Sequence, residues 1–298
     1  MMSLFVTTMR DNRRISTCVY MSGLAVVDSC VLITDAMYRV CVAHNLVPGF
    51  YANFLFLGFM KFSGNAFGMT SGLFLAEMSL DRAIAVSFPM KAVSICTASR
   101  ATKVVTVTFV IMMVCNSQTF FTYRVPDTPN GNLIRHIPDA AWLGPFLNIG
   151  LLIFGTILPF AVVIVCNCVI ILAVRRAAME RLKLESNPPS NKKKVEESNL
   201  TAILLLTSFA YLVCSCPLRI YETMAVYNLS DPYWLARYSF EWWLCAELWH
   251  LNFAVNFYIY FLGGGRKFRQ DAKSVIFGCC GLNPKVLSSS FASRSFNA

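Results

Sequence analysis

The sequence has few charged residues and few histidines for its length. Asp, Glu, Lys and Arg make up 14% of its 298 residues, and it contains three histidines. Apolar residues account for 56%. Soluble domains carry about 25% charged residues, so this composition excludes the ordinary soluble classes and indicates a membrane protein.

Groups of residues that perform catalysis or bind transition metals are also missing. No set of nucleophile, base and acid recurs across the apolar segments, so the sequence does not indicate an enzyme. The 12 cysteines include Cys-x-Cys pairs at 166–168 and 214–216, but neither pair has a histidine or acid cluster beside it, which argues against zinc. Cysteines inside apolar runs behave instead as small apolar side chains.

A cleavable signal peptide is not recognisable either. The apolar run at 1–8 is too short, and Arg10, Arg13 and Arg14 follow it. The sequence also shows no internal repeats and no paired broken helices, so a transporter or channel is not favoured.

The sequence does contain a series of long apolar runs. They cover residues 15–42, 51–88, 104–121, 142–176, 197–227 and 238–262. A helix needs about 20 residues to cross the hydrocarbon core, so each run predicts a span. We therefore expect an all-α membrane protein forming one domain over 1–298 with six complete spans. A short basic amphipathic surface helix is expected at about 264–277, before a tail at 278–298.

Basic residues gather on one side of the predicted spans. The net charge is +10, and the loops that follow residues 8, 88, 174 and 262 are basic. Of the 26 Lys and Arg, few lie in or near the segments of the opposite side: Arg39, Lys61, Arg124, Arg135, Arg219 and Arg237. This positive-inside distribution makes the basic loops cytoplasmic and membrane lipids a partner, whereas nucleic-acid binding is the weaker interpretation.

Charged residues inside two of the runs are costly in a bilayer and therefore indicate function. Asp28 and Asp35 lie seven residues apart, on one helix face, and Asp35 and Arg39 lie four apart, close enough to pair. Asp81 and Arg82 lie together near the inner end of the second run. The alternative for this pair is that both side chains extend to the interface to reach water.

Three features outside the runs predict further structure or modification. The polar stretch 122–141 contains Asn130-Gly131 between strand-like residues, which predicts a β-hairpin lid. Asn228 begins a glycosylation triplet in an outer loop, whereas the triplet at Asn199 lies on the basic side and is interpreted as chance. Cys279 and Cys280 follow the surface helix, where acylation would attach it to the membrane.

Several motifs, in order along the chain, resemble those of one receptor family. Leu24 to Asp28 resembles its second-helix signature, and Asp81-Arg82-Ala83 with Pro89 resembles its Asp-Arg-Tyr motif and the loop that follows. Pro159 matches the fifth-helix proline, Cys214 to Pro217 resembles Cys-Trp-x-Pro, and Asn252 with Asn256 to Tyr260 resembles Asn-Pro-x-x-Tyr. Together they resemble a rhodopsin-like (class A) G protein-coupled receptor that lacks most of its first transmembrane helix. The resemblance implies a seven-transmembrane receptor bundle in the plasma membrane, with Pro159 and Pro217 as helix-switch prolines.

The resemblance also implies a polar network in the middle of the bundle. In the family, a second-helix acid, a third-helix serine and two seventh-helix asparagines surround a sodium ion. The matching residues here are Asp28, Ser71, Asn252 and Asn256. A buried carboxylate among neutral oxygen ligands suits a hard monovalent cation, and the alternative is a structural polar network without an ion.

Two further sites follow from the resemblance. At the inner end, Arg82 would be held inactive by Asp81 and Glu197, and Pro89 and Tyr260 would take part in coupling to a G protein. The ligand pocket would be lined by Lys61, Gly64, Asn65, Gly68, Ser215, Arg219, Glu222, Trp242, Ala246 and His250. Amine receptors of the family carry an aspartate where Gly64 stands, so a peptide ligand is favoured over a small cationic amine. The alternative is that Arg219 and Glu222 only pair with Glu247 or with each other.

Several positions depart from the family's pattern. The motif residues Tyr, Trp and Pro are replaced by Ala83, Ser215 and Phe257, and the outer disulfide is lost, with Cys41 and Cys115 the only conceivable substitutes. We expect the sequence to be an incomplete version of a longer receptor, and the alternative is a genuine six-span relative. The favoured function is a G protein-coupled receptor for an extracellular ligand, with a peptide as the favoured class. The alternative is a non-signalling decoy or partner-binding membrane protein.

Overall fold

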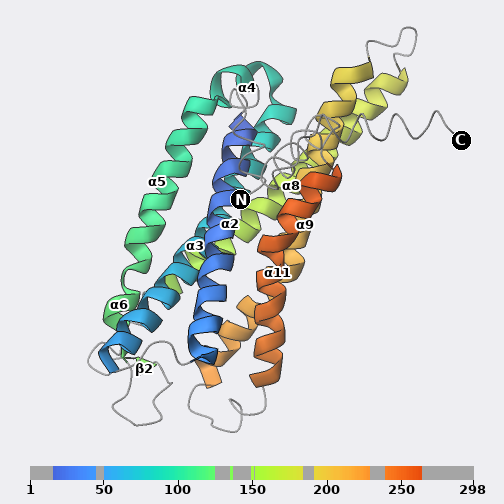
Figure 1. Ribbon diagram of the computed structural model, residues 1–298. Coiled ribbons are helices and arrows are strands. Elements are labelled where there is room, and N and C mark those ends of the chain that lie inside the picture. The colour runs from blue at the N-terminus through green and yellow to red at the C-terminus, as the bar shows by residue number, and fades with distance from the viewer. Residues whose placement is uncertain are drawn as a thin grey trace, which may run out of the picture.

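Long helices account for most of the chain that the structure, a computed structural model, describes: residues 16–44, 50–124, 135–136, 149–150, 152–183, 191–228 and 239–263 (Figure 1). The long helices of this part are α2 (Ser16–Ala43), α3 (Phe50–Ser87), α5 (Ala98–Asn116), α8 (Leu158–Lys183), α9 (Asn191–Asn228) and α11 (Ser239–Gly263). The shorter elements are α4 (Pro89–Ile95), α6 (Thr119–Thr122) and the π-helical turn η2 (Ile153–Ile157).

Four segments of the described residues are long and apolar enough to cross a membrane. They are Ser16–Cys41, Ala98–Asn116, Ile153–Arg176 and Ala202–Tyr221, within α2, α5, η2 with α8, and α9. The long helices α3 and α11 are not among these four segments, and both carry polar residues that are buried in the bundle. These are Ser63, Thr70, Ser71 and Ser79 on α3, and Asn252 and Asn256 on α11.

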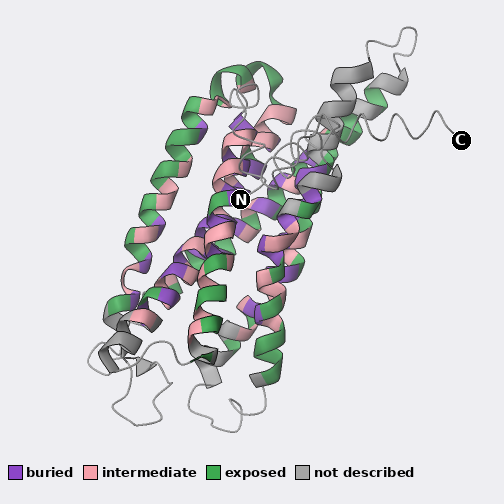
Figure 2. Ribbon diagram, viewed as in Figure 1, coloured by how far each residue is buried: buried purple, intermediate pink, exposed green. Residues whose placement is uncertain are grey.

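Helix α3 lies at the centre of the bundle. It packs most extensively against α2 and α8, and it also contacts α5 and α9, while α9 packs against α11. The core holds Leu24 and Val27 of α2, Phe74 of α3, Val163 of α8 and Tyr211 of α9. Helix α5 lies at the edge and exposes most of its surface (Figure 2), as expected of a largely apolar helix that faces lipid.

Two glycines of α3 allow neighbouring helices to approach closely. A Cβ atom on Gly72 would lie 2.4 Å from the Tyr211 Oη of α9, and one on Gly68 would lie 2.5 Å from the Trp249 ring of α11. Both distances are shorter than real Cβ contacts, so larger residues would force the helices apart. Gly68 therefore serves the packing of α3 on α11.

The two prolines that the sequence singles out lie within helical segments. Pro159 is buried at the second position of α8, directly after the π-helical turn η2. Proline has no N–H to continue the α-helical hydrogen bonds, and single π-helical turns accommodate such an interruption. Pro217 lies inside α9, three residues before Ile220.

A short strand pair occupies part of the predicted hairpin region. Strand β1 (Tyr123–Arg124) pairs antiparallel with β2 (Arg135–His136), with Tyr123 opposite His136. The turn residues Asn130 and Gly131 lie outside the described residues. So do the predicted surface helix, the tail and the acylation candidates Cys279 and Cys280. The side chain of Asn228, at the end of α9, is likewise not described.

Substituting Gly72 tests the close approach of α3 and α9. We expect Gly72→Ala to lower the free energy of unfolding by about 1–3 kcal/mol, because the new methyl group overlaps Tyr211. Gly64→Ala is the matched control, since nothing lies within 4 Å of its Cβ position on the same helix. The thermal unfolding midpoints of the detergent-solubilised proteins give the comparison. Equal midpoints for the two variants would contradict the packing.

Candidate functional site

A buried carboxylate in the middle of the bundle joins three helices. Asp28 of α2 is 4% exposed. Its Oδ1 accepts a hydrogen bond from Ser71 Oγ of α3 at 2.6 Å, and its Oδ2 accepts one from Asn256 Nδ2 of α11 at 2.8 Å. A carboxylate with two buried donors is far cheaper to place inside a bundle than an unpaired one. The structure thus brings three of the four predicted network residues into direct contact.

The fourth network residue, Asn252, lies one turn before Asn256 on α11. It is 1% exposed, and within the described part of the chain neither its Oδ1 nor the Oδ1 of Asn256 has a hydrogen-bond partner. Buried polar atoms without a partner are uncommon and need an explanation. The carboxylate of Asp28, the hydroxyl of Ser71 and the amide oxygens of the two asparagines are all oxygen ligands. Hard cations prefer such ligands, so these residues fit a sodium ion.

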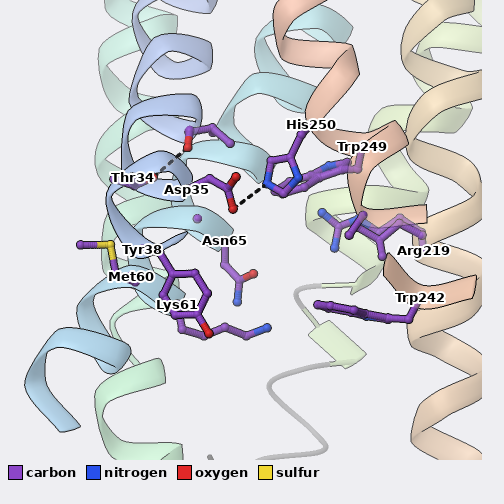
Figure 3. A pocket seen from close by; sticks show the side chains of 14 residues that line it. Thr34, Asp35, Tyr38, Met60, Lys61, Asn65, Arg219, Trp242, Trp249 and His250 are labelled. Carbon is purple, nitrogen blue, oxygen red and sulfur yellow. Dashed lines mark hydrogen bonds and ion pairs between the residues drawn. The ribbon is translucent and has the colours of Figure 1, made fainter. Parts of the chain in front are cut away.

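A cavity of about 380 Å³ lies between α2 and α3 on one side and α9 and α11 on the other (Figure 3). Its lining combines apolar and charged side chains: Val31, Thr34, Asp35, Tyr38, Met60, Lys61, Gly64, Asn65, Leu218, Arg219, Trp242, Ala246, Trp249 and His250. This volume and mixture are typical of a pocket for a small ligand or for one end of a larger one.

The predicted pocket residues divide between the cavity and the surrounding packing. Those that line it are Lys61, Gly64, Asn65, Arg219, Trp242, Ala246 and His250. Gly68 and Ser215 are not in the lining, because Gly68 packs beneath Trp249 and Ser215 is 2% exposed. The side chain of Glu222 lies outside the described residues.

An ion network connects α2 with α11 at the cavity. Arg39 Nε lies 2.7 Å from Asp35 Oδ2, so the pair that the sequence spacing predicts is confirmed. Arg39 Nη2 lies 2.6 Å from Glu247 Oε1, and His250 Nε2 lies 3.3 Å from Asp35 Oδ1. Glu247 therefore pairs with α2, and the acids near the cavity are already engaged by groups of the protein.

At the inner end of α3, the first residues of α2 engage both members of the Asp81-Arg82 pair. Ser16 Oγ donates to Asp81 Oδ2 at 2.7 Å, and Arg82 Nη2 donates to Thr17 Oγ1. Ser16 and Thr17 are both buried. The interface alternative, in which both side chains extend to water, does not describe these contacts.

The loop after α3 adds a further contact to this inner site. Cys96 Sγ donates to the backbone carbonyl of Asp81 at 3.5 Å. Burial, followed by the nearby Asp81 carboxylate, raises the pKa of the Cys96 thiol to about 11, so it stays protonated and able to donate. Pro89 is exposed at the first position of α4. The side chains of Glu197 and Tyr260 lie outside the described residues.

Sequence reasoning predicted Asp28 for the central network but missed the residues that α2 supplies to the cavity and to the inner site. The cavity residues Thr34, Asp35 and Tyr38 belong to α2, as do Ser16 and Thr17 at the inner end. The shared helix face of Asp28 and Asp35 was the available signal for the cavity. No sequence pattern marks Ser16 or Thr17, because hydroxyl residues are ordinary near helix ends.

The arrangement described so far is that of a membrane receptor: a helical bundle with a cavity at one end, a buried polar network in its middle and an acid-base pair at the other end. The chain matches the family described as 7 transmembrane receptor (rhodopsin family) over residues 1–274. It therefore belongs to the rhodopsin family of seven-transmembrane receptors, and it is a multi-pass protein of the plasma membrane.

Three curated proteins illustrate the similarity. The FMRFamide receptor of Drosophila melanogaster is 26% identical over 277 residues, covering 88% of this chain and 48% of that receptor. Cysteinyl leukotriene receptor 1 of Mus musculus is 26% identical over 160 residues, covering 52% of this chain and 42% of the relative. The same receptor of Sus scrofa is 25% identical over 220 residues, covering 72% and 60%. The chain thus spans less than two thirds of the length of these relatives.

Proposed function

We propose that the chain is a G protein-coupled receptor that binds an extracellular peptide and activates a heterotrimeric G protein. Three polar sites lie along α2 and α3, and this arrangement supports a receptor that passes a change from one end of the bundle to the other. The cavity contains Asp35 and Lys61, the central network joins Asp28 to Ser71, and the inner site joins Thr17 to Arg82. A ligand that shifts α2 against α3 would act on all three sites.

Two observations support a peptide as the ligand. The cavity has side chains of both charge signs together with two tryptophans, which suits a ligand with several kinds of group. The similarity to the FMRFamide receptor extends over 88% of the chain, and that relative is named for a peptide.

The proposed mechanism is a shift between two packings of the same bundle. In the packing described here, Thr17 accepts a hydrogen bond from Arg82, and Ser16 donates one to Asp81. Hydrogen bonds to charged groups contribute about 1.5–3 kcal/mol each, so their loss must be offset by contacts that form only in the other packing. Ligand contacts in the cavity and G protein contacts to the released Arg82 would supply this free energy.

We further propose that the central network holds a sodium ion. Asp28, Ser71, Asn252 and Asn256 would hold it, with the amide oxygens of the two asparagines, which have no hydrogen-bond partner among the described residues, as ligands. The ion would supply a positive charge to offset the desolvated carboxylate of Asp28. The residues themselves keep α2, α3 and α11 together.

A second candidate function is binding of a ligand or partner without signalling. It is favoured by Ala83, which follows Arg82 and is buried in a small apolar cluster with Cys166 and Ile170 of α8. The Asp-Arg-Tyr motif has a polar tyrosine there, so this helix end packs differently. Ligand binding without any nucleotide exchange by a partner G protein would favour this candidate.

Removing the Arg82 guanidinium tests the receptor function. We expect Arg82→Ala to reduce peptide-driven nucleotide exchange to the rate of membranes without the receptor, because the G protein loses its contact. Membranes from cells that produce the chain are assayed with Phe-Met-Arg-Phe-amide and related peptides, at matched surface levels. Arg100→Ala, an exposed arginine of α5, is the control and keeps the wild-type rate. Normal exchange in Arg82→Ala would refute the proposed coupling.

The sodium site is tested by exchanging the salt. We expect the thermal unfolding midpoint of the purified chain to be higher in sodium chloride than in choline chloride. Binding at five times the dissociation constant contributes about 1 kcal/mol. Asp28→Asn removes the difference, whereas Asp81→Asn, at a carboxylate outside the network, retains it. Equal wild-type midpoints in the two salts, or a difference that survives in Asp28→Asn, would rule out the site.

A further inference from the structure

The acidic residues at the cavity are already paired with basic groups of the protein. Asp35 lies in the lining and contacts both Arg39 at 2.7 Å and His250 at 3.3 Å. Glu247, beside the cavity, contacts Arg39 at 2.6 Å. An incoming cation would have to displace Arg39 from these acids, so the acids offer little to a cationic ligand.

Lys61, a basic residue on the same side of the cavity as Asp35, has different surroundings. Lys61 of α3 lines the cavity, and within the described part of the chain it forms no ion pair. Figure 3 shows its amine end directed into the cavity, beside Tyr38 and Asn65. An ammonium group in a partly enclosed cavity gains most from an anion placed next to it.

The surroundings of Lys61 provide both donors and space for such an anion. The Tyr38 hydroxyl and the Asn65 amide can each donate a hydrogen bond to an oxyanion. Gly64 lies next to them, and its Cβ position has no atom within 4 Å, so the space beside Lys61 is open. Trp242 and Trp249 face this group across the cavity, with the guanidinium of Arg219 over the Trp249 ring at 5.4 Å (Figure 3).

We propose that Lys61 binds a carboxylate of the ligand, with Tyr38 and Asn65 donating to the same oxygens, and that the ligand's apolar side chains face the two tryptophans. This assignment rests on the proposed function as a peptide receptor. A carboxylate can come from a free C-terminus or from an acidic side chain, and both have the chemistry that Lys61 recognises. The receptor therefore selects an acidic ligand, and Lys61 determines that selectivity.

Three peptides of matched length separate the sources of the carboxylate. They are Phe-Met-Arg-Phe-amide, the same peptide with a free C-terminus, and Phe-Met-Asp-Phe-amide. Each is titrated against the purified chain, and the concentration dependence of the thermal unfolding midpoint gives its affinity. We expect at least one carboxylate peptide to bind about 10- to 100-fold more tightly than Phe-Met-Arg-Phe-amide, the range for a charge-assisted hydrogen bond.

Variants of Lys61 then test whether this residue causes the preference for the carboxylate peptides. Lys61→Gln should abolish the preference for a carboxylate, and Lys61→Arg should retain it. Lys91→Gln, an exposed lysine of α4, is the matched control and keeps the full preference. The midpoints without peptide show whether each variant folds, and Lys61→Arg keeps the comparison informative if Lys61→Gln does not.

Two kinds of negative result lead to different conclusions about Lys61 and about the peptide. Binding without a preference for the carboxylate peptides, or a preference that survives in Lys61→Gln, overturns the role of Lys61 and leaves the peptide receptor standing. Absence of binding by all three peptides contradicts the proposed peptide function, and the role of Lys61 falls with it.

Discussion

Polar side chains buried in a membrane bundle must find their partners within the bundle, because the surrounding lipid offers none. In this chain, polar side chains of α2 find several of these partners on α3. Asp28 meets Ser71 in the middle, while Asp81 meets Ser16 and Arg82 meets Thr17 at the inner end. These contacts fix both the register and the rotation of α2 against α3, and the other helices pack around that pair.

The position of the cavity follows from the same pairing. Once Asp28 faces Ser71, Asp35 of α2 lies two turns further toward the outer end, on the face that meets α11 and in the cavity that Lys61 also lines. The glycines of α3 let Tyr211 and Trp249 close the bundle beneath the cavity. Helix α5, in contrast, mostly faces lipid, and one of its few polar links to the bundle is the hydrogen bond that Thr108 donates to Glu77 of α3.

Spacing along one helix is enough to predict a contact within that helix, whereas residues of different helices were assigned to a common site from the family resemblance. The pair Asp35 and Arg39 was predictable because both residues belong to one helix and lie one turn apart. The predicted cavity residues of α3, α9 and α11 came from the family resemblance, and most of them line the cavity. Gly68 was misplaced because its nearest neighbour, Trp249, comes from another helix and fills the space in front of it.

Contacts between helices were predicted only where the family resemblance supplied them, as for Asp28, Ser71 and Asn256. Nothing in the residues around Ser16 and Thr17 states that they meet Asp81 and Arg82, which lie 65 positions later. Family resemblance directed attention to Glu197 instead, and its side chain lies outside the described residues. Ser16 and Thr17 point inward because of the way α2 is rotated in the bundle. That rotation depends on the contacts of Asp28 with Ser71 and Asn256, which form only when the helices pack together.

In the packing described here, α2 restrains Arg82 through Thr17. Nucleotide exchange by a partner G protein in the absence of peptide measures that restraint. Thr17→Val keeps the shape of the side chain but removes the oxygen that accepts from Arg82, whereas Thr17→Ser keeps that oxygen. At equal surface levels, we predict exchange above the wild-type rate for Thr17→Val and the wild-type rate for Thr17→Ser. A wild-type rate for Thr17→Val would contradict this restraint of Arg82.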